Sequence, residues 1–158
     1  MIAILPCGRH KLAPDQFPAL AKDVYIGPLA GNLIRLFEGG IGIKGSYLIL
    51  SAQWGLMHPT QIIPETYDLR ISEQYDNLKY LRRLKEQFEW LGKGVYETYL
   101  PKAYLDFLYM YYPTITFLSR LRDDGTKSSQ ELWEDLMACG ALIGATVTTK
   151  RKEILKKA

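Results

Sequence analysis

The sequence predicts an α/β fold: a single domain of atypical topology, with a mostly parallel central sheet flanked by helices. Short apolar runs alternate with segments of helical periodicity, an order typical of a sheet covered by helices. Two of these runs end abruptly in polar residues, as buried strands do where they leave a sheet. The chain of 158 residues also has the size of one domain. We expect this domain to span residues 1–149 and a basic tail to span residues 150–158.

The first expected elements follow from apolar runs and helix-bounding residues. The run 1–5 predicts a strand, and the run 46–50 predicts a second strand that ends at Ser51. Between them we expect a helix over residues 29–38, because Pro28 suits the first helical position. The two strands should therefore be parallel neighbours joined through a helix.

A long helix is expected over residues 73–91. Apolar side chains that recur every three or four residues predict its core face: Leu78, Leu81, Leu84, Phe88, Leu91 and Val95. Glu86 falls almost opposite that face, with Arg82 one turn before it and Trp90 one turn after it. A tryptophan on a polar helix face is unusual, so this surface is of functional interest.

The remaining expected elements complete the alternation. They are a helix over 102–112, a strand over 114–118, a helix over 129–139 and a last strand over 145–149. Ser128 and Glu131 have the spacing of a capping box before the third of these.

Charge and cysteine content narrow the class of protein. The net charge is +3, and two cysteines without a C-x-x-C spacing do not make a disulfide framework or a typical zinc site. No apolar run reaches the roughly 18 residues of a membrane span, and the start of the chain lacks the features of a signal peptide. We therefore expect a reduced cytoplasmic protein that does not bind membranes.

Polar residues after the first and second strands predict an anion-binding pocket. Gly8 permits a turn with positive φ, and Arg9 and Lys11 follow it at the end of the first strand. Ser51 stands at the end of the second. Because ligands of open α/β sheets bind outside the carboxyl ends of the strands, these residues should share one pocket. Cys7 is a thiolate candidate at this turn, although a small buried residue is the alternative.

A second set of residues predicts contact with DNA phosphates and bases. Its members are Arg82, Arg83, Lys85 and Trp90 on the long helix and Lys150, Arg151 and Lys152 in the tail. A solvated helix face with an Arg82–Glu86 ion pair and a frayed tail is the alternative. Eleven tyrosines and three tryptophans exceed the needs of a core. Exposed aromatics suit either nucleic-acid stacking or a subunit interface, including that of a homodimer.

Carboxylates near these cations raise the question of a metal. Phosphodiester hydrolysis by metalloenzymes uses carboxylates that hold Mg²⁺ through oxygen. Glu86 is the candidate catalytic carboxylate, which would orient water or the metal. Asp68 is the candidate metal ligand, and a turn residue is the alternative for that position.

Four segments of the chain resemble a family of uncharacterised bacterial, archaeal and viral domains that is distantly similar to the YaaA peroxide-stress proteins. The matching segments, all within about the first 70 residues, are Cys7-Gly8-Arg9-His10-Lys11, Tyr25-Ile26-Gly27-Pro28-Leu29, Leu50-Ser51-Ala52-Gln53-Trp54-Gly55-Leu56-Met57-His58-Pro59 and Tyr67-Asp68. The resemblance implies a role connected with DNA or nucleobases and no particular reaction.

The chain as a whole, in its length, tyrosine content and basic end, also resembles small nucleases of filamentous viruses that infect hyperthermophilic archaea. That resemblance implies hydrolysis of double-stranded DNA, here in the cytoplasm of a host cell. We therefore expect a deoxyribonuclease acting on linear duplex DNA. Two alternatives stay open: a nucleotide- or nucleobase-processing enzyme centred on Cys7, Lys11, Ser51 and Asp68, and a DNA-binding accessory protein without catalysis.

Overall fold

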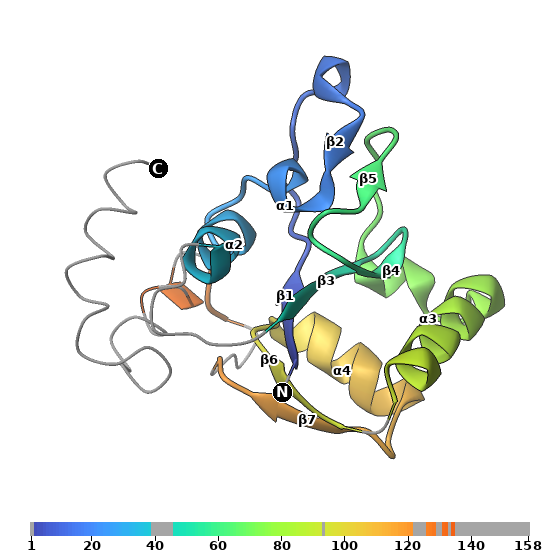
Figure 1. Cartoon of the computed structure of the whole chain (residues 1–158). Helices are drawn as coiled ribbons and strands as arrows, with labels where there is room; N and C mark the ends of the chain where they lie inside the picture. The colour runs from blue at the N-terminus through green and yellow to red at the C-terminus, as the bar shows by residue number, and fades with distance from the viewer. Residues whose placement is uncertain are drawn as a thin grey trace.

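A five-stranded mixed sheet forms the centre of the computed structural model, which describes residues 2–38, 46–92, 94–121, 126–128, 131–132 and 134 (Figure 1). The strands lie in the order β4-β3-β1-β6-β7. Their bounds are β1 Ile2–Pro6, β3 Tyr47–Ser51, β4 Gly55–Met57, β6 Val95–Thr98 and β7 Thr116–Ser119. All neighbours are parallel except β4, which is antiparallel to β3. The predicted α/β class with a mostly parallel sheet is confirmed.

Helices cover both faces of this sheet. Their bounds are α1 Ala21–Val24, α2 Ala30–Glu38, α3 Leu78–Leu91 and α4 Lys102–Tyr111, with short 3₁₀ turns η1 Pro14–Gln16 and η2 Ile71–Gln74. In Figure 1, α2 lies on one side of the sheet and α3 and α4 on the other. A separate antiparallel ribbon joins β2 (Ala19–Leu20) to β5 (Ile62–Ile63).

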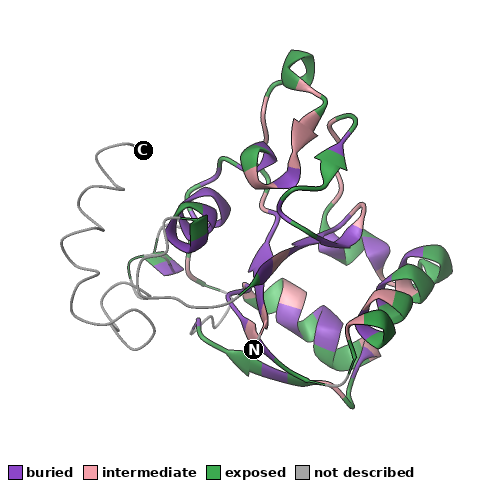
Figure 2. Cartoon of the chain, viewed as in Figure 1, coloured by how far each residue is buried: buried purple, intermediate pink, exposed green. Residues whose placement is uncertain are grey.

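Alternation along the central strands divides the buried side chains between two cores. Ala3 and Leu5 of β1 pack with α2, whereas Ile4 between them packs with α3 and α4. In β3, Ile49 likewise lies in the core with α2, and Leu50 lies in the core with α3 and α4. Figure 2 shows this burial as a purple band along β1 and β3. The two central strands are therefore buried on both faces, as in parallel sheets generally.

Helix α3 differs in two ways from the helix predicted over 73–91. It begins only at Leu78, because Asn77 caps it through a bond from the Tyr80 N–H to its side-chain oxygen, and η2 precedes it as a separate turn. The predicted core face is also partly wrong. Leu84 and Phe88 are buried, but Leu78 is 72% exposed. Val95 lies in β6, beyond the end of the helix, and is 40% exposed.

Strand β4 was not predicted, and the side chain of Gln87 explains how so short an edge strand is held. Its carbonyl oxygen accepts from the Leu56 N–H at 2.8 Å, and its amide donates to the Leu56 carbonyl at 3.0 Å. The Gln87 amide thus pairs with β4 as a neighbouring strand would, which closes this edge of the sheet. The polar turn after β3 spans only residues 52–54, because Gly55 already begins β4 and is buried.

Strand β6 was also not predicted, and the strand expected over 114–118 is displaced to β7. The N-cap half of the predicted capping box is confirmed, because the Glu131 N–H donates to the Ser128 hydroxyl. The Glu131 carboxylate accepts from that hydroxyl rather than from the Ser128 N–H of a full capping box. The predicted strand 145–149 and the basic tail with Lys150, Arg151 and Lys152 lie outside the described residues, as does most of the helix predicted over 129–139. Within the described ranges, no helix is long and apolar enough to cross a membrane.

Candidate functional site

The loops that follow β1 and β3 lie at one edge of the sheet. Because these strands are parallel neighbours, with Pro6 aligned to Leu50, the segments from Cys7 and from Ser51 leave the sheet on the same side. The prediction that the two polar breaks share an edge is confirmed. The detailed contacts show what each residue does there.

Ser51 is fully buried and holds the start of the β3–β4 turn through hydrogen bonds. Its hydroxyl accepts from the N–H groups of Gln53 and Trp54, both at 3.0 Å, and lies 2.7 Å from the Tyr67 hydroxyl. The Tyr80 hydroxyl donates to its carbonyl at 2.6 Å. With these bonds made, Ser51 orders the β3–β4 turn and lies below the surface that a ligand would meet, which departs from the role in an open pocket that we expected.

Two tyrosines link Ser51 to Lys11. The hydroxyls of Tyr25 and Tyr67 lie 2.5 Å apart, and Tyr67 also bonds Ser51. The Lys11 ammonium lies 4.6 Å from the centre of the Tyr67 ring and 3.4 Å from the Gly8 carbonyl, to which it donates. The ring face and the carbonyl both favour a cation, so they hold Lys11 beside the carboxyl end of β1.

Cys7 lies beneath this edge rather than on it. The residue is 1% exposed, and its sulfur is 3.2 Å from the hydroxyl of Tyr104 on α4. Burial, with the nearby Cys7 as the next cause, raises the pKa of Tyr25, Tyr67 and Tyr104 well above the usual value. All three hydroxyls are therefore neutral at pH 7, and the formal charge at this edge comes from Arg9 and Lys11.

A pocket of about 190 Å³ opens beside this cluster, between the Gly8–His10 loop and the start of α2. Its lining is Pro6, Gly8, Arg9, His10, Gly27, Pro28, Leu29, Ala30, Pro101 and Tyr104. Gly8 has φ 69°, as predicted, and a side chain there would meet the Ala30 Cβ at 3.3 Å. The loop therefore approaches the helix closely because this position is glycine.

The first turn of α2 lines this pocket with Leu29 and Ala30. The turn closes with the Gly31 N–H bonded to the Gly27 carbonyl. The N–H groups of Leu29 and Ala30 precede that bond and have no helical acceptor. Such groups, with the positive end of the helix dipole, favour an anion. Arg9 and His10 face the same pocket.

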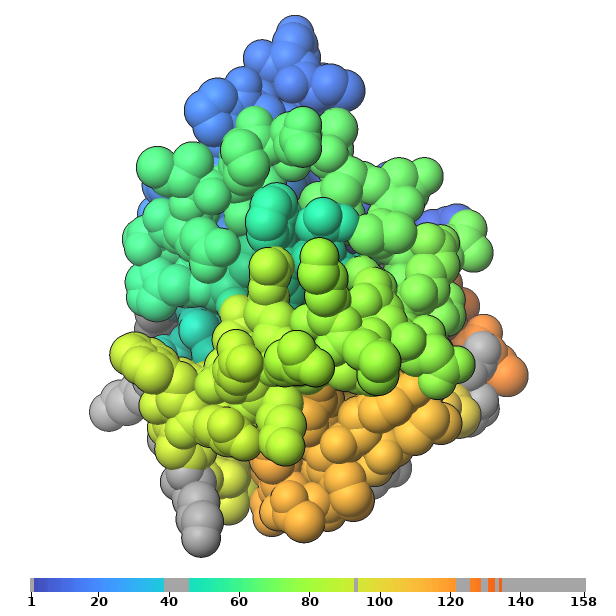
Figure 3. Space-filling view, turned by 90° about the vertical axis from the view of Figure 1, so that its right-hand side faces the viewer, coloured from blue at the N-terminus to red at the C-terminus, as the bar shows by residue number. Residues whose placement is uncertain are grey.

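Glu86 lies on a different surface, the outer face of α3. Figure 3 shows this face, with α3 in yellow-green across the middle. Glu86, Arg82, Arg83 and Lys85 are all exposed, and Trp90 is 86% exposed. The prediction that Glu86 and Trp90 point away from the core is confirmed, and Glu86 is not among the residues that line the pocket beside Gly8. A catalytic role for Glu86 remains a prediction.

The acidic residues do not form a metal cage in the part of the chain that the structure describes. No three side chains of the His, Cys, Asp and Glu types come together there as a metal site would require. Asp68 is exposed in the loop between β5 and η2, and Glu86 is exposed on α3. The Mg²⁺ ligand predicted at Asp68 therefore belongs to no cluster of three such side chains in these ranges.

The tyrosines of the site were not singled out by sequence reasoning about chemistry. Tyr25 and Tyr67 do stand in two of the quoted motif segments, which was the available signal. Tyr104 had none, since it lies within an ordinary helical pattern 97 residues from the cysteine that it bonds.

Comparison with known proteins gives one partial similarity. The chain is 27% identical over 94 residues to the uncharacterized protein YfjM of Bacillus subtilis (strain 168), covering 58% of this chain and 61% of that protein. This chain thus spans about three fifths of the relative, whose name states no activity. No family model matches the chain. No solved structure matches it.

Proposed function

We propose that this protein is a nucleotide- or nucleobase-processing enzyme that holds a phosphate group of its substrate at the carboxyl edge of β1 and β3. One observation supports this proposal above all: the pocket between the Gly8–His10 loop and the start of α2 combines Arg9 and His10 with the first turn of that helix, whose leading N–H groups have no helical acceptor. Cations and backbone donors together are the usual means of binding phosphate.

The volume of this pocket, about 190 Å³, suits a phosphate with part of its sugar. Lys11 lies beside it on the Tyr67 ring and adds a second cation to that of Arg9. Cys7 and Tyr104 form the layer beneath, with Tyr104 reaching from the thiol to the pocket wall. In this proposal Arg9 and the backbone bind the phosphate, and Lys11 supplies the adjacent charge for the reacting part of the substrate.

The test is a titration of the full chain with a nucleoside monophosphate and with inorganic phosphate, followed by NMR. Saturable shifts should appear at Gly8, Arg9 and Ala30. Arg9→Gln should weaken binding about tenfold, because a charge-assisted bond is lost. Arg83→Gln, the same change on the exposed face of α3, is the matched control. Equal binding by both variants would remove the proposed phosphate site.

Deoxyribonuclease activity on linear duplex DNA is the second candidate. It is favoured by Trp90, whose 86% exposure on a helix face with Arg82 and Arg83 is unusual for a tryptophan. Cations and an exposed ring suit contact with DNA. A Mg²⁺ ion would draw its protein ligand from Glu86, and it would supply charge stabilisation at the phosphodiester.

Glu86→Gln separates this candidate from two non-catalytic explanations of the same surface. DNA cleavage with Mg²⁺ should be lost in Glu86→Gln and retained in Glu73→Gln, which changes the same charge at an exposed position in η2. A salt-dependent DNA shift without cleavage would instead indicate an accessory DNA-binding protein. A concentration-dependent homodimer that Trp90→Ala dissolves would identify this face as a subunit contact.

A further inference from the structure

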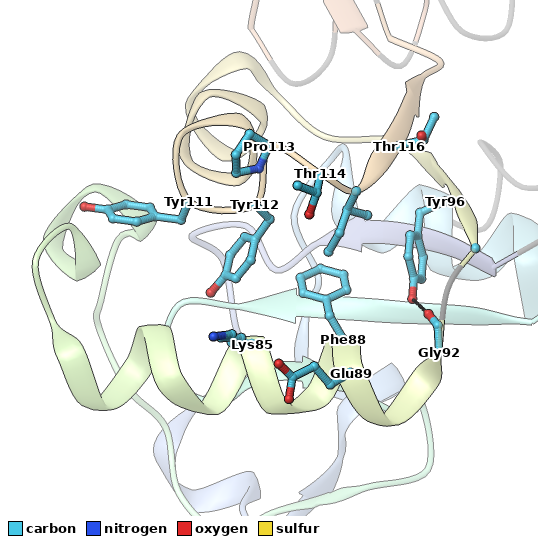
Figure 4. Close-up of a pocket in the computed structure, with 12 residues that line it drawn as sticks. Lys85, Phe88, Glu89, Gly92, Tyr96, Tyr111, Tyr112, Pro113, Thr114 and Thr116 are labelled. Atoms are coloured by element: carbon cyan, nitrogen blue, oxygen red, sulfur yellow. Dashed lines mark hydrogen bonds between the residues drawn. The ribbon is translucent and has the colours of Figure 1, made fainter.

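A second and larger hollow lies at the opposite ends of the strands, where β6 and β7 begin. This groove of about 760 Å³ runs between the C-terminal half of α3 and the segment that links α4 to β7. Figure 4 shows its residues, with Lys85 and Glu89 on α3 facing the side chains of Tyr112 and Phe88. None of the functions proposed above makes use of it.

The floor of the groove is apolar and uncharged. It is formed by Phe88, Tyr96, Tyr112 and Ile115. The hydroxyls of these two tyrosines are bonded to backbone carbonyls: Tyr112 donates to Leu81 at 2.9 Å, and Tyr96 donates at 3.4 Å to Gly92, which also lines the groove. Burial, with Tyr111 as the next cause, raises the pKa of Tyr112 to about 12. The floor therefore presents carbon surface, which suits a flat apolar group.

One wall of the groove carries a donor and an acceptor side by side. Lys85 and Glu89 are one helical turn apart and both line the groove. Residues at this spacing on a helix have Cβ atoms about 6 Å apart. In the described part of the chain neither side chain has a hydrogen-bond or ion-pair partner. An ammonium and a carboxylate are therefore available together above an apolar floor.

We propose that this groove binds a guanine base, with the Glu89 carboxylate accepting from the N1–H and N2–H groups and Lys85 donating to O6. Guanine presents these two donors next to an acceptor on one edge. Adenine and cytosine carry an amino group beside a ring nitrogen that accepts hydrogen bonds, and this acceptor would face the carboxylate and repel it. Uracil carries only one N–H, between two carbonyls, so it offers the carboxylate a single donor. Guanine alone places two donors opposite Glu89 and an acceptor opposite Lys85.

This base site is separate from the proposed phosphate site and does not depend on it. The phosphate pocket lies where β1 ends, whereas the groove lies where the parallel strands β6 and β7 begin. A strand of five residues such as β1 places these edges about 13 Å apart. The probe for the base is therefore guanosine, which has no phosphate.

The full chain is titrated with guanosine and, in parallel, with adenosine by NMR or calorimetry. Guanosine should bind saturably, and adenosine at least about tenfold more weakly. Glu89→Gln and Lys85→Met should each weaken guanosine binding about tenfold and leave the circular dichroism spectrum unchanged, because both positions are exposed. Glu73→Gln, with the same charge change in η2, should bind as the parent does.

Two further comparisons complete the test. Arg9→Gln should keep full guanosine affinity, so loss of the phosphate site would leave this inference standing. A single-stranded trinucleotide with a central guanine identifies the source: tighter binding than guanosine indicates nucleic acid, and equal binding indicates a free nucleoside or nucleotide. Equal affinity for adenosine and guanosine, no binding of either, or an unchanged affinity in Glu89→Gln would overturn the proposal.

Discussion

Removing the Tyr67 hydroxyl should show how strongly the two loops of the phosphate site are coupled. Tyr67→Phe keeps the ring that holds Lys11 and deletes the bonds to Tyr25 and Ser51. Ser51 retains two backbone donors, so little is lost there. The Tyr25 hydroxyl, in a residue 2% exposed, loses its 2.5 Å partner. Ser51 is a second side-chain partner of Tyr25, so we expect a loss of stability near the lower end of the about 1–3 kcal/mol that an unsatisfied buried group costs.

The double variant Tyr25→Phe/Tyr67→Phe tests the reason for that loss. With both hydroxyls gone no buried donor is left unpaired, so the double variant should be no less stable than Tyr67→Phe alone. The sum of the stability losses of Tyr25→Phe and Tyr67→Phe would then differ from the loss in the double variant by about 1 kcal/mol. Tyr109→Phe is the matched control: Tyr109 is 46% exposed and its hydroxyl lies 3.4 Å from its acceptor, so the change should stay within about 0.5 kcal/mol.

Urea unfolding followed by circular dichroism measures Tyr67→Phe, Tyr25→Phe, their double variant and Tyr109→Phe, with the slope of the transition as the check that each unfolds in the same way. Additive single effects, or a Tyr67→Phe variant as stable as the parent, would refute the picture of a shared buried hydroxyl cluster. Ligand binding gives a second reading. Because the Tyr67 ring is kept, phosphate affinity should change little in Tyr67→Phe and fall in Tyr67→Leu.

Three other perturbations have defined outcomes. Gly8→Ala forces a side chain into a backbone of φ 69°, 3.3 Å from the Ala30 Cβ, and thermal unfolding should show a loss of about 1–2 kcal/mol. Gln87→Leu leaves the Leu56 N–H unpaired and opens the edge of β4. Urea unfolding should then show a loss of about 1–3 kcal/mol, and light scattering should show new association. A monomeric variant as stable as the parent would contradict the role of Gln87 in covering this edge. The buried tyrosines have raised pKa values, whereas unfolded tyrosine titrates near 10. The unfolded state therefore loses protons first, and stability should fall as pH rises above about 10, by about 1.4 kcal/mol per unit for each such group, as followed by tyrosinate absorbance.

Much of the fold could be predicted from local pattern. Apolar runs at 1–5 and 46–50 gave β1 and β3 because a strand buried on both faces has a continuous apolar sequence. The N-cap at Ser128 could likewise be predicted, because its bond joins residues three apart. Strands β4 and β6 could not, since three or four residues carry too little periodicity, and pairing with β3 and β1 is what makes them strands.

The features of the site also differ in whether they follow from the sequence or from the tertiary structure. The sequence by itself determined that Gly8 can turn with positive φ and that the chain becomes polar after β1 and β3, because backbone preference and the end of an apolar run are local properties. It also determined that Glu86 faces outward, from helical period alone. Only the tertiary structure decided that Ser51 is buried, that Tyr104 meets Cys7 from 97 residues away, and that α2 begins at the pocket. These are contacts between distant segments, fixed by the order of strands in the sheet.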